Sequence, residues 1–100
     1  MYESKLKSEE LTSLFEAVLK LQDMEDCYRF FEDLCTVHEL HSLAQRLEVA
    51  KMLREKVIYQ EIADKTGAST ATISRVNRSL LYGADGYLRV LDRLDGKKKQ

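Results

Sequence analysis

The apolar residues in the first third of the chain recur with the period of an α-helix. Between residues 11 and 19 they fall at positions i, i+3, i+4, i+7 and i+8, and the same spacing returns between residues 27 and 35. In a helix these positions share one face, whereas a half-buried strand alternates at every second residue. The pattern predicts two amphipathic helices, with apolar faces made of Leu11, Leu14, Phe15, Val18 and Leu19 and of Cys27, Phe30, Phe31, Leu34 and Cys35.

Four more helices are predicted in the rest of the chain. Thr36 and Glu39 have the spacing of a capping box, so a third helix is expected to begin there and to run to about Glu55. Shorter helices are expected over about 59–66, 70–81 and 86–94. The predicted inward residues are Leu40, Leu43, Ala44, Leu47 and Ala50 in the third helix and Tyr87, Val90, Leu91 and Leu94 in the last. The chain has no proline and only four glycines, which favours an all-α protein of six helices.

The length of 100 residues, with 44% hydrophobic and 33% charged residues, is typical of one globular domain. We expect a single all-α domain over residues 1–94, in which residues 1–35 form dimerisation helices, followed by a polar tail over 95–100. No run of about 18 apolar residues and no signal-peptide pattern is present, so a cytoplasmic location with no membrane partner is predicted. Cys27 and Cys35 lie eight residues apart in one predicted helix, too far apart to pair, and are expected to be reduced core thiols.

Charge is divided unevenly along the chain. Residues 1–50 contain 5 Lys or Arg and 11 Asp or Glu, whereas residues 51–100 contain 11 and 6, so the halves carry net charges of −6 and +5. Between residues 65 and 84 the chain has Lys65, Arg75 and Arg78 and no acidic residue. Such a local positive charge favours a polyanionic partner, although solvation of a helix surface is the ordinary explanation of a charge cluster.

The segment from Tyr59 to Val76 has the spacing of a helix-turn-helix. Ala63 is small where two helices would cross closely, and Gly67 can adopt the positive φ that ends the first helix. Ile62, Ile73 and Val76 are predicted to face the core. In this motif the second helix enters the major groove of DNA.

The polar residues of this segment are candidates for contact with double-stranded DNA. Hydroxyl groups can bond to base edges, and cations and amides can hold the phosphate backbone. The expected base-reading residues are Ser69, Thr70, Thr72 and Ser74, and the expected backbone-positioning residues are Gln60, Lys65, Arg75 and Arg78. The alternative is a helical protein-interaction module in which the same hairpin only packs and binds no DNA.

Three stretches carry a resemblance to a known family: Gln60–Ala63, Gly67–Ala68 and Ala71–Arg75. From about Thr36 to Leu94 the chain resembles the tryptophan repressor family, and more closely its YerC/YecD-like branch. The resemblance implies a homodimer of six-helix subunits that binds operator DNA and represses transcription, with N-terminal helices that interlock between subunits. The DNA-contacting positions of the family fall on Gln60, Ser69, Thr70, Ala71, Thr72 and Ser74.

The resemblance also implies candidate positions for an effector. The residues that hold tryptophan in the repressor correspond here to Thr36, Arg46 and Arg75. Where the repressor has a glycine that leaves room for the indole ring, this chain has Val76, and a close-packed interior tolerates little extra volume. We therefore predict no cofactor and no tryptophan corepressor, and expect the two arginines to pair with Glu39, with Glu48 or with phosphates.

Other groupings do not reach the requirements of a metal or catalytic site. His38 and His41, even with Glu39 or Glu48, fall short of the four well-placed ligands of a closed zinc site. The acidic residues around both cysteines disfavour a reactive thiolate. Neither a glycine-rich phosphate loop nor a Gly-x-Ser-x-Gly or His-Glu-x-x-His pattern occurs. We predict that the protein is not an enzyme and has no metal ligands.

Overall fold

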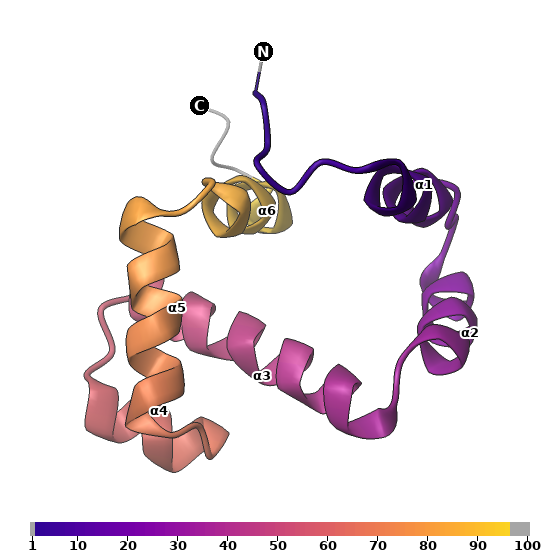
Figure 1. The fold of residues 1–100 in the computed structure, drawn as a ribbon. Helices are drawn as coiled ribbons and strands as arrows, with labels where there is room; N and C mark the ends of the chain where they lie inside the picture. Colours follow the sequence, from indigo (N-terminus) through magenta and orange to yellow (C-terminus); the bar gives the residue numbers. More distant parts are fainter. Residues whose placement is uncertain (1, 97–100) are drawn as a thin grey trace. The chain divides into compact units, whose positions relative to one another are not determined.

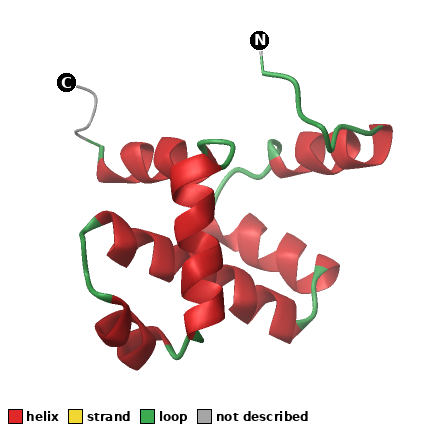
Figure 2. Cartoon of the chain, turned by 60° about the vertical axis from the view of Figure 1, so that its left-hand side comes forward, coloured by secondary structure: helices red, strands yellow, loops and turns green. Residues whose placement is uncertain are grey.

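The computed structural model describes residues 2–96, and their regular structure is entirely helical (Figure 1 and Figure 2). The six helices in this part of the chain are α1 (Glu9–Val18), α2 (Met24–Leu34), α3 (Val37–Arg54), α4 (Tyr59–Thr66), α5 (Thr70–Tyr82) and α6 (Gly86–Asp95). The predicted all-α fold with six helices is confirmed, and the predicted bounds of the last four helices agree to within a residue. Residues 97–100 of the expected polar tail lie outside the described residues.

Contacts divide the chain into two units, and the boundary between them in the sequence follows Thr36. The first unit contains α1 and α2, and a polar side chain caps the start of each helix. Ser8 Oγ accepts a hydrogen bond from the Leu11 amide at 3.0 Å, and the Asp23 carboxylate accepts one from the Asp26 amide at 2.8 Å. These caps satisfy amides that the first helical turn leaves without an intrahelical partner.

The apolar faces of α1 and α2 remain open within the single chain. No residue of either helix is buried, and Phe15 is 53% exposed. The rings of Phe30 and Phe31 meet edge to face with centroids 5.5 Å apart. Cys27 and Cys35 are free thiols but only half-buried, so their predicted place in the core is wrong. The reason is that these two helices enclose no core of their own.

The second unit contains the hydrophobic core. Its buried residues are Val49 and Ala50 of α3, Ile62 of α4, Ala68 of the turn, Ile73 and Val76 of α5, and Leu91 of α6. Each of these helices contributes to one cluster, which joins α4 and α5 to the longer α3. The predicted inward positions Ile62, Ile73 and Val76 are confirmed.

The buried faces of α3 and α6 are narrower than predicted. Leu43 is 46% exposed and Ala44 is also exposed, whereas Val49, which was not expected inside, is fully buried. In α6, Val90 and Leu94 reach the surface. Because α3 contacts α4, α5 and α6, a buried face deduced from one helical period does not describe all of its contacts.

A charged contact joins the end of α3 to α6. The Arg54 guanidinium forms an ion pair with the Asp92 carboxylate, and its Nη2 atom lies 4.0 Å from Asp95 Oδ2. The Arg54 side chain is 26% exposed. A directional contact thereby connects two residues that lie 38 positions apart in the sequence.

Candidate nucleic-acid interface

The helix α5 has one face in the core and the opposite face in solvent. Ile73 and Val76 are buried, whereas eight residues of the helix are exposed. Five of the eight are candidates for contact with DNA, namely Thr70, Ala71, Ser74, Arg75 and Arg78, and the other three are Ser79, Leu81 and Tyr82. Figure 2 shows α5 at the front, with one side uncovered by other helices. The core therefore holds the helix while its polar face stays free to contact another molecule.

Two of the predicted base-reading residues bond to each other at the start of α5. Ser69 Oγ accepts a hydrogen bond from the Thr72 amide at 3.1 Å and donates one to Thr72 Oγ1 at 3.2 Å. Ser69 thus caps the helix, a role that stabilises its first turn. Thr72 Oγ1 still carries its own hydrogen, which is available to an external acceptor. The structure therefore gives these two residues a structural role that the sequence analysis did not assign.

The predicted backbone-positioning residues of α4 lie next to acidic side chains. Lys65 Nζ is 3.4 Å from Glu61 Oε2, with the two side chains 60% and 51% exposed. Gln60 Nε2 lies 3.4 Å from Asp64 Oδ1. A surface ion pair of this kind is weak and exchanges readily. Lys65 can therefore turn to a phosphate at small cost, although Glu61 reduces the local positive charge.

The cations of α5 are not neutralised in this way. Arg75 and Arg78 are both exposed, and neither forms an ion pair with any residue between 2 and 96. A guanidinium presents its donors in a planar fork that matches a phosphate group. The strongest free positive charge of the helix pair is thus on α5.

The turn between α4 and α5 has the predicted conformation. Gly67 adopts φ 74°, and its amide donates to the Ala63 carbonyl at 2.9 Å, which ends α4. Behind the turn, Gln45 Nε2 of α3 donates to the Thr66 carbonyl at 3.0 Å. Sequence reasoning missed Gln45, because a glutamine on a polar helix surface gives no signal of a contact 21 residues away.

The start of α4 is a further feature that the sequence did not reveal. Its N-cap is Ile58, which makes no side-chain hydrogen bond to the helix. The amides of Tyr59, Gln60 and Glu61 therefore receive no side-chain cap, in contrast to the starts of α1, α2 and α5, and the start of α6 at Asp85 is likewise uncapped. Open amides at a helix start are suited to phosphate oxygens.

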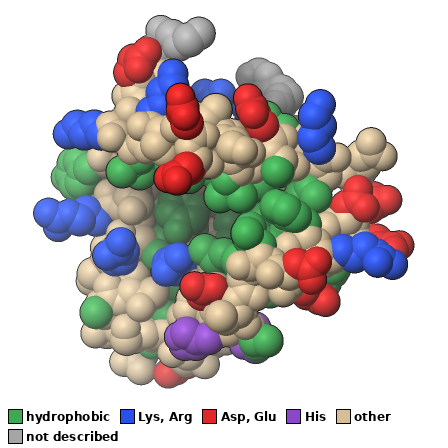
Figure 3. All heavy atoms as spheres, turned by 45° about the vertical axis from the view of Figure 1, so that its right-hand side comes forward, with side chains coloured by type: hydrophobic (Ala, Val, Ile, Leu, Met, Phe, Trp, Pro, Cys, Tyr) green, Lys and Arg blue, Asp and Glu red, His purple; other side chains and the backbone are tan. Residues whose placement is uncertain are grey.

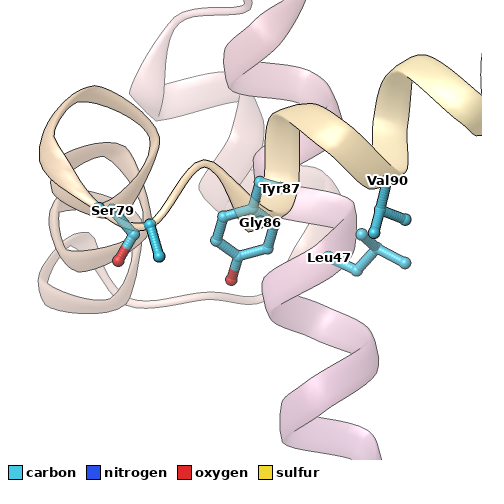
Figure 4. A pocket seen from close by; sticks show the side chains of 7 residues that line it. Leu47, Ser79, Gly86, Tyr87 and Val90 are labelled. Atoms are coloured by element: carbon cyan, nitrogen blue, oxygen red, sulfur yellow. The ribbon is translucent and has the colours of Figure 1, made fainter. Parts of the chain in front are cut away.

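An open hollow of about 500 Å³ lies where α3, α5 and α6 meet (Figure 4). Leu47 and Val90 form apolar walls, and the Ser79 hydroxyl and the Tyr87 ring lie at its other side. The hollow is mainly apolar and broadly open, features that suit the edge of a protein contact better than an enclosed ligand site. Figure 3 shows that hydrophobic side chains also reach the surface elsewhere.

Comparison with known families agrees with this arrangement. The profile of the family described as Trp repressor protein matches residues 9–95. The chain belongs to the Trp repressor family. The matched residues include all six helices of the described chain, α4 and α5 among them.

A protein from Bacillus subtilis and a crystal structure from Eubacterium eligens are similar to this chain. The chain is 61% identical over 90 residues to the Bacillus subtilis (strain 168) protein YerC, described as uncharacterized; the match covers 90% of this chain and 86% of YerC. The crystal structure of a TrpR-like protein from Eubacterium eligens ATCC 27750 has 63% sequence identity and a TM-score of 0.88. It covers 91% of this chain and 94% of that one. The fold is therefore that of the Trp repressor family, whose members are regulators and not enzymes.

The candidate effector residues lie in different surroundings. Arg46 is half-buried on α3 and Arg75 is exposed on α5, whereas Thr36 belongs to the first unit. Of the three partners expected for the arginines, Glu48 pairs with neither, and its Oε2 atom instead lies 3.1 Å from Lys51 Nζ. The reason is that Lys51 lies one helical turn along the same face.

Residues 2–96 contain neither a candidate metal site nor a candidate membrane span. Between residues 2 and 96 no three His, Cys, Asp or Glu side chains gather in a way that could hold a metal ion. In the same part of the chain no helix has both the length and the hydropathy needed to cross a bilayer.

Proposed function

We propose that the protein is a transcriptional regulator that binds specific double-stranded DNA sequences as a homodimer and acts as a repressor. The observation that carries the proposal is the exposed polar face of α5, which presents hydroxyl and guanidinium groups while Ile73 and Val76 anchor the other face in the core. A helix held in this way has the geometry needed to lie in a major groove.

The residues of the helix pair divide into two groups by their chemistry. We assign base contacts to the hydroxyl and methyl groups at the start of α5, since hydroxyls bond to base edges and the methyls of alanine and threonine can contact thymine. This group comprises Ser69, Thr70, Ala71, Thr72 and Ser74. We assign backbone contacts to Gln60, Lys65, Arg75 and Arg78, together with the open amides at the start of α4.

The proposal of a homodimer is supported by the apolar surface that a single chain leaves open. Neither α1 nor α2 has a buried residue, and the hollow lined by Leu47 and Val90 is open on α3 and α6. Large exposed apolar patches of this kind mark interaction sites in monomeric structures. Two copies related by a twofold axis would present two copies of α5 to successive major grooves, about 34 Å apart.

We also propose that DNA binding does not require tryptophan. Val76 is 1% exposed and belongs to the core cluster, so its side chain occupies volume that a bound ring would need. Opening that volume would require neighbouring core residues to move, which close packing resists. Calorimetry with L-tryptophan tests this: saturable binding at micromolar ligand that also tightens DNA binding would overturn it.

The place of action follows from the proposed function. The similar proteins come from bacteria, whose chromosome lies in the cytoplasm, and we propose that compartment for this protein.

Selection from a pool of random duplexes tests the DNA-binding proposal. We expect the full chain to enrich a sequence with twofold symmetry, and we expect Ser74→Ala to change the base preference at one position in each half-site. The rival interpretation is a protein-interaction module, for which no sequence would be enriched. A salt series separates the two, because release of counterions makes DNA affinity fall steeply with salt, whereas a packed protein contact is less sensitive.

A further inference from the structure

The turn between α4 and α5 receives a hydrogen bond from outside the helix pair. Gln45 is half-buried on α3, and its Nε2 atom donates to the Thr66 carbonyl oxygen at 3.0 Å. Thr66 is the last residue of α4, and the final carbonyls of a helix have no intrahelical partner. The glutamine therefore satisfies an acceptor that the helix itself leaves open.

Thr66 is also the centre of the hydrogen bonds within the turn. Its Oγ1 atom donates to the Ile62 carbonyl at 2.8 Å and accepts from the Ala68 amide at 3.1 Å. Gly67, between them, has φ 74°, and a Cβ placed on it would lie 3.9 Å from Gln45 Nε2. Gln45 thus lies directly against the turn whose shape sets the direction of α5.

The other contacts between α3 and the helix pair are of a different kind. The core cluster joins Val49 and Ala50 of α3 to Ile62 and Ile73 through apolar packing. Apolar burial is strong but not directional. A hydrogen bond depends on distance and angle, so it restricts the position of the turn in a way that packing alone does not.

We infer that Gln45 is a positioning residue for DNA recognition: its hydrogen bond to Thr66 fixes the turn and thereby the orientation of α5 on the duplex. The inference rests on the proposed function. Ser69, the N-cap of α5, follows Thr66 by three residues, so a displaced turn displaces the start of the reading helix. Gln45 itself is assigned no contact with DNA.

The test uses Gln45→Met, which keeps the length of the side chain and the helix propensity but removes the donor. The matched control is Ser42→Ala, a neutral change at another half-buried position of α3. In the free protein we expect hydrogen exchange of the Ala68 amide to become about tenfold faster in Gln45→Met, the size expected for leaving a partly buried carbonyl unpaired. Exchange at Ala68 in the control is expected to stay within about twofold of the wild type.

The DNA measurement uses the duplex obtained by selection and an unrelated duplex of equal length. We expect Gln45→Met to lower the affinity for the selected duplex about tenfold and to leave the affinity for the unrelated duplex nearly unchanged. The salt dependence should keep its slope, because no phosphate contact is lost. A variant that merely lowered the folded fraction would weaken binding to both duplexes equally.

Unchanged exchange at Ala68, or an unchanged ratio of the two affinities, overturns the inference. If the wild type binds no duplex selectively, the proposed function fails, while the exchange rate at Ala68 still shows whether Gln45 holds the turn. Should Gln45→Met not fold, Gln45→Glu provides the exchange measurement, since a carboxylate of similar shape cannot donate to Thr66.

Discussion

Replacement of Val76 by alanine tests how tightly the core holds the proposed DNA-binding helix. The Val76 side chain is 1% exposed and belongs to the cluster that also contains Ile73 and Leu91. Removing the equivalent of two buried methylene groups costs about 1.6 kcal/mol in transfer free energy. A cavity that the neighbouring side chains do not fill adds about 1 kcal/mol to this loss of stability. The higher helix propensity of alanine offsets about 0.5 kcal/mol of it. We expect a net loss of about 2 kcal/mol in the free energy of unfolding.

The matched control is Thr70→Ala in the same helix. Threonine and valine have nearly the same shape, so the two changes remove the same number of heavy atoms, but Thr70 is exposed at the start of α5. A surface change of this kind alters stability by less than about 0.5 kcal/mol. Both variants are compared by urea denaturation at one protein concentration, because the stability of a dimer depends on concentration. Equal stabilities of the two variants would refute the assignment of Val76 to the packed core.

Three further predictions concern the ends of the chain and its charges. Asp92→Asn should lower stability by about 1 kcal/mol, because it weakens the contact of α6 with the partly buried Arg54; the midpoint of denaturation checks this, and a rise in stability would contradict it. Arg78→Gln should make the negative slope of log affinity against log salt less steep by about 1 while leaving stability unchanged, and an unaltered slope would remove Arg78 from the interface. Deletion of residues 2–22 should abolish the dimer, as measured by light scattering; a deletion variant that remains dimeric would show that α1 is not needed for association.

The local features of this protein could be predicted from the sequence. Helix positions depend on the spacing of apolar residues and on the residues at helix ends, which act over three or four positions along the chain. The turn at Gly67 follows from a residue that alone adopts a positive φ without strain, and its observed φ of 74° agrees. The separation of α5 into a buried face and an exposed polar face also follows from the sequence, because Ile73 and Val76 lie three positions apart.

The tertiary structure decided the features that depend on distant residues. Whether Leu43 or Val49 is buried depends on which helices reach each part of α3, and no local pattern contains that information. Similarly, the hydrogen bond from Gln45 to Thr66 joins residues 21 positions apart. The sequence does not distinguish a polar residue that will have such a distant partner from one that will not. Local propensity acts within a helical turn, whereas packing and directional contacts between helices exist only once the chain has folded.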